Sequence, residues 1–142
     1  MRGLLAGLVL GVVALGAAGC NEYHYYDVNV KFNVSAGNFA GITDFSTVQV
    51  IVMNVSGADN GSIQIGPNSG GLPATSSTVG VFEFSTFADS GTLTFTALAY
   101  NDSTSQQACQ VGRGMVSATA SSMTTNNLDL TIDKTGVGCA NP

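Results

Sequence analysis

Few side chains in this 142-residue sequence could carry out catalysis or bind a metal ion. The single histidine, His24, stands in the aromatic run N-E-Y-H-Y-Y. A general base needs a fixed position and an oriented partner, and a terminal tether supplies neither. Asp59, Asn60 and Ser62 carry oxygen ligands, but their spacing differs from that of the calcium-binding loop D-x-[DN]-x-[DN]-G, so a turn is the simpler interpretation. We therefore expect no catalytic residue, no metal site, no cofactor and no enzymatic activity.

The composition narrows the possible partners. Hydrophobic residues make up 44% of the chain, which is enough for one folded domain. Charged residues make up only 9%, so the polar surface must consist of Ser, Thr, Asn and Gln, as suits an exported β protein. The net charge is −5 with four basic residues, and such a chain cannot neutralise a row of phosphates. Nucleic acid is therefore excluded as a partner.

The first nineteen residues have the order of a secretory signal peptide. Arg2 is followed by an apolar stretch from Leu4 to Leu15 and then by small residues. The alternative is a membrane helix, because Gly3, Gly7 and Gly11 have the G-x-x-x-G spacing that packs such helices. Even when it is counted through Gly19, the apolar run is roughly 16 residues long, which is shorter than the roughly 20 that cross a bilayer. A cleaved signal peptide that takes no part in the fold is the favoured interpretation.

The signal ends in Ala17, Ala18, Gly19 and Cys20, which resemble the lipobox of bacterial lipoproteins. The match differs at Ala17, where leucine or a similar branched residue is more usual. The resemblance implies cleavage before Cys20 and attachment of diacylglycerol, with fatty acids such as palmitate, to that cysteine. It implies a membrane partner and a place in the bacterial cell envelope, and Asn21 resembles the sorting signal for the outer membrane. The alternative is ordinary cleavage after Ala18 or Gly19, which would leave Cys20 as a plain thiol.

The cysteine count supports the lipoprotein interpretation. The chain has three cysteines, and if Cys20 carries lipid an even pair remains. A disulfide between Cys109 and Cys139 would close a loop of about 30 residues, which the chain-entropy relation values at roughly 3.5 kcal/mol. A metal site is a poor alternative, since these cysteines lack C-x-x-C spacing and a nearby histidine.

The elements that position any binding surface are predicted to be β-strands, because hydrophobic residues recur with period two. In the segment D-V-N-V-K-F-N-V, residues 27–34, one side carries Val28, Val30, Phe32 and Val34. Further strands are expected over 47–55 and, at a short edge, over 62–65. Two more are expected within 79–100, where a tight turn at 88–91 joins them into a hairpin. A final pair is expected within 108–118 and 126–133. The turn-rich segment between 56 and 78 is expected to include a mobile loop around Gly70 and Gly71, and loops of this kind often carry function.

About seven short strands separated by turn signals predict an all-β fold, namely a two-sheet β-sandwich with immunoglobulin-like or transthyretin-like topology. An up-and-down barrel is the alternative. The segment V-S-A-T-A-S-S-M-T-T-N-N-L-D-L-T-I is similar to a stretch in small β-sandwich domains of secreted bacterial lipoproteins. The expected organisation is a signal peptide over 1–19, a lipid anchor and tether over 20–26, and one sandwich domain over 27–142.

Two functions fit these features. The first is a non-enzymatic, lipid-anchored cell-envelope protein whose β domain is an interaction or structural module. The second is a ligand-binding module, for carbohydrate as an example, that is lipid-anchored or secreted. The second function predicts a groove lined by exposed Tyr or Phe near the loop Gly66–Thr78. No feature of the sequence specifies whether the partner is a protein or a glycan.

Overall fold

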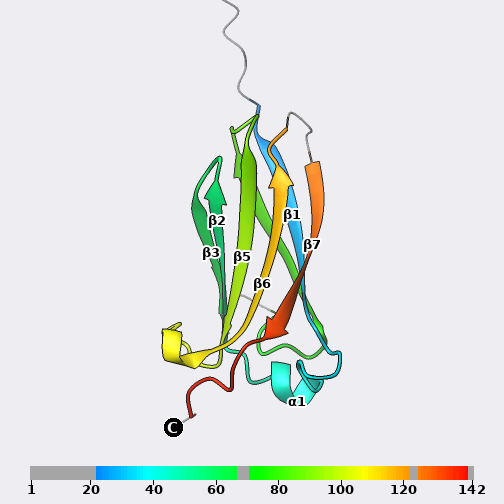
Figure 1. The fold of residues 1–142 in the computed structure, drawn as a ribbon, viewed down its shortest axis with the longest axis vertical. Helices are drawn as coiled ribbons and strands as arrows, with labels where there is room; N and C mark the ends of the chain where they lie inside the picture. Colours follow the sequence, from blue (N-terminus) through cyan, green and yellow to red (C-terminus); the bar gives the residue numbers. More distant parts are fainter. Residues whose placement is uncertain (1–21, 67–70, 122–124, 141–142) are drawn as a thin grey trace, which may run out of the picture.

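The computed structural model describes residues 22–66, 71–121 and 125–140, and its regular structure is almost entirely β (Figure 1). The strands are β1 (His24–Phe32), β2 (Val50–Gly57), β3 (Gly61–Ile65), β4 (Thr78–Thr86), β5 (Thr92–Tyr100), β6 (Gln110–Thr119) and β7 (Thr125–Lys134). A helix α1 (Ile42–Phe45) and a 3-10 turn η1 (Gln107–Cys109) complete the elements. The all-β prediction is confirmed. Within the described ranges, no helix is long and apolar enough to cross a membrane.

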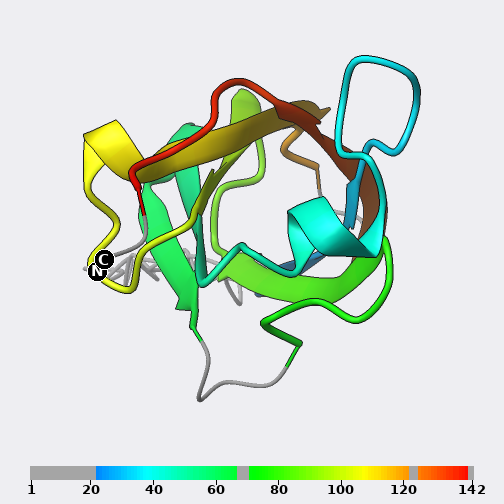
Figure 2. The same ribbon diagram turned by 90° about the horizontal axis from the view of Figure 1, so that it is seen from below.

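The seven strands form one sheet in the order β3-β2-β5-β6-β7-β1-β4, and this sheet curves into a nearly closed barrel (Figure 2). A two-sheet sandwich is therefore not confirmed. The strand order also differs from that of an up-and-down barrel, because β1 lies between β7 and β4. β1 runs parallel to β7, with Val28 beside Leu128, and the other neighbouring strands are antiparallel.

The barrel interior is built from the alternating hydrophobic positions. The buried strand residues are Tyr26, Val28, Val30 and Phe32 on β1, Val50, Ile51, Met53 and Val55 on β2, Phe82 on β4, Leu93, Phe95, Ala97, Ala99 and Tyr100 on β5, Val111 on β6, and Leu130 and Ile132 on β7. Val34 was expected inside but is exposed, because β1 ends at Phe32 and the amide of Ser35 turns back to Asn33 Oδ1. β1 also begins earlier than the alternation predicted, so His24 to Tyr26 of the expected tether form its first residues.

β4 and β5 do not form the predicted hairpin. β4 pairs with β1, whereas β5 pairs with β2 and β6. The apolar faces of the two strands meet across the interior instead, where the rings of Phe84 and Phe95 lie edge to face with centroids 5.8 Å apart. If β4 and β5 formed one hairpin, their apolar faces would lie side by side and a further layer would be needed to bury them. In the barrel, the two faces bury each other.

The predicted disulfide between Cys109 and Cys139 is present, with the two Cα atoms 4.4 Å apart. It lies at the end of the barrel where β5, β7 and β1 finish, close to the C-terminal segment (Figure 1). The predicted pairing of β6 with β7 is also observed, with Lys134 opposite Gly112.

The same end of the barrel is covered by the connection between β1 and β2, which contains α1 (Figure 1). Phe39 and Phe45 pack against Phe32, with ring centroids 4.8 and 5.5 Å away. Lys134 donates to Asp44 over 2.8 Å, and this bond is the main reason why the pKa of Asp44 is lowered. β3 is the short edge strand predicted from its sequence. The expected mobile loop around Gly70 and Gly71 falls largely on residues 67–70, outside the described residues.

Candidate functional site

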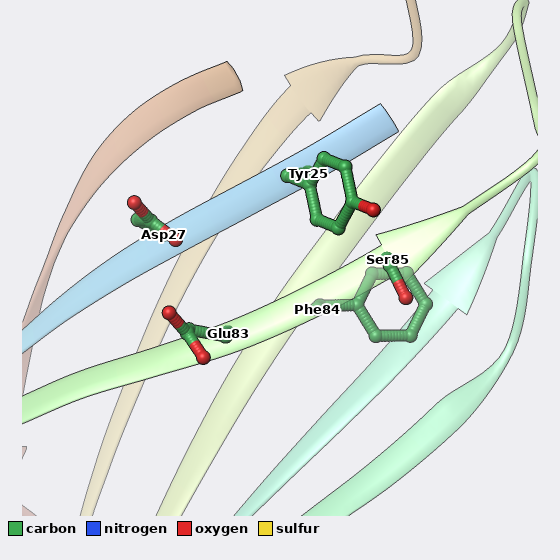
Figure 3. A pocket seen from close by; sticks show the side chains of 5 residues that line it. All are labelled: Tyr25, Asp27, Glu83, Phe84 and Ser85. Atoms are coloured by element: carbon green, nitrogen blue, oxygen red, sulfur yellow. The ribbon is translucent and has the colours of Figure 1, made fainter. Parts of the chain in front are cut away.

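A groove of about 500 Å³ lies on the side of the barrel over β1 and β4 (Figure 3). Tyr25 and Asp27 line it from β1, and Glu83, Phe84 and Ser85 line it from β4. The antiparallel register places Tyr25 opposite Ser85 and Asp27 opposite Glu83. The groove is therefore a surface of paired side chains from neighbouring strands.

Period-two alternation determines which side chains line this groove. Tyr26 and Val28 point into the core, so Tyr25 and Asp27 must point outward. β4 is an edge strand that pairs only with β1, and its other edge faces β3.

The gap between β3 and β4 is closed by side chains. A Cβ atom on Gly61 would lie 2.9 Å from the ring of Phe84, so this ring fills the space beside β3. Thr86 on β4 donates to Asp59 Oδ2 over 2.5 Å, and the amide of Asn60 donates to the other oxygen. These bonds, the one from Thr86 above all, lower the pKa of Asp59. Asp59 thus ties the β2–β3 connection to β4 at the barrel seam.

The groove has the chemistry to bind a polyhydroxylated or cationic ligand. Tyr25 is half exposed, so its ring face is free to stack on the apolar face of a sugar. Asp27 and Glu83 are like charges directly opposite each other, a pairing that an antiparallel sheet disfavours. A ligand that donates hydrogen bonds or carries an ammonium group would relieve this repulsion. The part of the chain that the structure describes contains no group of three or more His, Cys, Asp or Glu side chains suited to a metal ion.

The residues singled out in the sequence lie apart from this groove. His24 is buried inside the end of the barrel opposite Thr86, and its Nδ1 has no hydrogen-bond partner among the described residues. Cys109 and Cys139 form their disulfide at the opposite end. Cys20, the predicted lipidation site, lies outside the described residues.

The binding groove was expected near Gly66–Thr78, but the exposed aromatic side chains lie elsewhere. Tyr23, Tyr25 and Phe87 are near the start of β1 and the end of β4, whereas the loop after β3 lies at the other end of the barrel. Each groove residue could have been predicted to face outward from the alternation of its own strand. That they lie together depends on the pairing of β1 with β4, which was not predicted because β4 was expected to pair with β5.

No family model, curated protein or solved structure matches this chain. The functional proposals below therefore rest on its own residues and geometry.

Proposed function

We propose that this protein is a lipid-anchored component of the bacterial cell envelope, located at the outer membrane. We further propose that its barrel is a non-enzymatic interaction or structural module. The anchor is Cys20, acylated after removal of residues 1–19. The observation that carries the proposal is the disulfide between Cys109 and Cys139.

The disulfide supports the proposal in two ways. Disulfides form and persist in oxidising compartments such as the periplasm and the cell surface, which fits an exported chain. It also uses two of the three cysteines, so Cys20 is the one left for other chemistry. An exported protein with an odd cysteine needs a use for it, and the small residues before Cys20 supply the context for lipidation.

The anchor is tested by the Cys20→Ala substitution in the full chain expressed in a bacterium. We expect the native protein to remain in the membrane fraction after high-salt washing and its intact mass to equal residues 20–142 plus the acyl groups. Cys20→Ala should lose the acyl mass and should not be cut before residue 20.

A second chain separates anchoring from export. In it, an ordinary secretory signal that ends in Ala-x-Ala replaces residues 1–19 and the Cys20→Ala change is kept, so that cleavage occurs without acylation. This chain should be recovered in the soluble periplasmic fraction. A native protein that carries no acyl mass, or one that is as soluble as this control, would refute the anchor.

The groove supports a second candidate function, the binding of carbohydrate. The supporting observation is the combination of the half-exposed Tyr25 with the opposed carboxylates of Asp27 and Glu83. An amino sugar fits both features, because its pyranose face can stack on the ring while its ammonium group pairs with the carboxylates. This role is compatible with the anchor, since the groove lies on the side of the barrel.

The carbohydrate function predicts that a glucosamine oligosaccharide binds better than its N-acetylated counterpart. In isothermal titration calorimetry, Asp27→Asn combined with Glu83→Gln should weaken binding by at least about a hundredfold, because two charged hydrogen bonds of about 1.5–3 kcal/mol each are lost and every 1.4 kcal/mol is a factor of ten. Asp129→Asn is the matched control, because Asp129 is an exposed carboxylate on β7 outside the groove lining. Equal binding by all three proteins, or no binding at all, would contradict this function.

A further inference from the structure

Three exposed aromatic side chains gather at the end of the barrel where the described chain begins. Tyr23, Tyr25 and Phe87 are 48, 51 and 49% exposed. The rings of Tyr23 and Phe87 are in contact, with centroids 3.8 Å apart, and the ring of Tyr25 lies 6.4 Å from that of Tyr23. We call these three residues the aromatic end patch.

The patch is distinct from the rest of the described surface. The other large hydrophobic residues that are exposed there are Val34, Val81, Met115 and Val137, and none of them is aromatic. They come from four different segments of the chain. The aromatic end patch instead joins two segments that the fold brings together, the start of β1 and the connection between β4 and β5. Single exposed hydrophobic residues are ordinary, whereas a contiguous cluster indicates an interaction surface.

The length of chain between Cys20 and the patch indicates what the surface meets. Tyr23 follows Cys20 by three residues, and an extended chain spans at most about 3.6 Å per residue, so the two are separated by no more than about 11 Å. A diacylglycerol on Cys20 therefore places the rings at the membrane surface. Each headgroup region of a bilayer is about 5–7 Å thick, which is within this reach. Tyr side chains favour this region because the ring is apolar and the hydroxyl is polar.

The charges near the patch indicate which kind of membrane contact is made. The charged residues of the segments at this end are acidic, namely Glu22, Asp59 and Asp89. The described basic residues are Lys31 near the end of β1, Arg113 near the start of β6 and Lys134 at the end of β7, all toward the opposite end of the barrel. Attraction to anionic lipid therefore cannot hold the patch at the surface, since that attraction depends on clustered Lys or Arg. The contact is aromatic and suits a neutral interface.

We propose that the aromatic end patch of Tyr23, Tyr25 and Phe87 inserts into the interfacial region of the bilayer that holds the Cys20 lipid. It fixes the barrel with its N-terminal end toward the membrane. Lipid then covers the ring of Tyr25, so membrane insertion and the stacking of a sugar on Tyr25 are alternative uses of that ring, and the carboxylates of Asp27 and Glu83 lie beside the surface. This inference rests on the proposed lipid anchor. The anchor alone would leave the barrel free to tumble on a short tether, whereas the patch gives it one orientation.

The test uses tryptophan fluorescence, because the chain contains no tryptophan. The mature lipidated protein, residues 20–142, with Phe87→Trp is reconstituted into vesicles of phosphatidylcholine. The acyl chains of this lipid are brominated near the headgroup. We expect the emission to shift to shorter wavelength and to lose at least half of its intensity relative to unbrominated vesicles. Tyr23→Trp provides a second reporter, and Val137→Trp is the control, since Val137 is 88% exposed in the C-terminal segment at the opposite end. The control should show no quenching.

The outcomes separate the patch from the anchor. Protein that fails to sediment with the vesicles would refute the Cys20 anchor. Protein that sediments while the tryptophans at positions 87 and 23 are no more quenched than the one at 137 would refute the patch and leave the anchor intact. Quenching that appears only after half of the lipid is replaced by phosphatidylglycerol would also overturn an aromatic contact. A concentration-dependent blue shift without vesicles would assign the patch to a second copy of the chain instead.

Discussion

Replacing both Cys109 and Cys139 by serine is expected to lower the free energy of unfolding by about 3.5 kcal/mol, the chain-entropy value for a loop of about 30 residues. The disulfide joins the start of β6 to the segment that follows β7, so its loss frees the chain around the β6–β7 hairpin. The measurement is urea denaturation of the mature chain, followed by circular dichroism, with oxidised protein as the reference.

Two further measurements check this expectation. Adding a reductant to the native protein should reproduce the loss, and the double variant should be insensitive to the reductant. Asn101 also holds the C-terminal segment, because its amide donates to Cys139 O over 2.8 Å and its oxygen accepts from the Cys139 amide over 3.2 Å. If these two hydrogen bonds were sufficient, the double variant would lose less than about 1 kcal/mol, and the disulfide would have no major role in stability.

The local part of the fold could be predicted from the sequence because strand alternation is a local property. The buried residues Val28, Val30 and Phe32 on β1 were assigned to one face from period two alone. The edge position of β3 followed from its short length and its turn-rich flanks. The disulfide followed from counting cysteines once Cys20 had been assigned to lipid.

Strand pairing could not be predicted in the same way, because it is decided by contacts between distant residues. Val28 lies beside Leu128, one hundred positions later in the chain, and no local pattern indicates that parallel pair. The tight turn signal at Asp89 and Gly91 suggested a hairpin, but burial of Phe84 against Phe95 across the interior determined the path of the chain. Tertiary burial overrode turn chemistry here, as it often overrides local propensity.

The candidate site was missed for the same reason. Tyr25, Asp27, Glu83 and Ser85 are ordinary outward positions on two strands, and only the β1–β4 register brings them together. The aromatic run around His24 is evident in the sequence, but the sequence does not indicate which of its rings are buried and which are exposed. Tyr26 enters the core beside Phe95, whereas Tyr23 and Tyr25 remain on the surface.

The close approach of β6 to β7 depends on a glycine whose importance the sequence did not indicate. Among the residues that the structure describes, β6 and β7 pair at Gly112 with Lys134 and at Arg113 with Asp133. A Cβ atom on Gly114 would lie 2.3 Å from Thr131 O and 2.6 Å from Leu130 Cδ2. The first of these atoms belongs to the backbone of β7, so it cannot move without displacing the strand. Glycine is thus required at this position for close approach, and not for an unusual backbone angle.

Gly114→Ala is therefore expected to lower the free energy of unfolding by about 3 kcal/mol, at the upper end of the usual cost of overpacking. Two other glycines provide a graded series in the same urea denaturation experiment. Gly112→Ala should cost less, because the atom nearest its new methyl group is the Cγ2 of Ile132 at 2.7 Å, and a side chain can shift. Gly66→Ala should change stability by less than about 0.5 kcal/mol, since among the described residues the atom nearest its new methyl group would be a methyl carbon of Val50 at 4.0 Å. If Gly114→Ala were as stable as Gly66→Ala, β6 and β7 would not approach each other this closely.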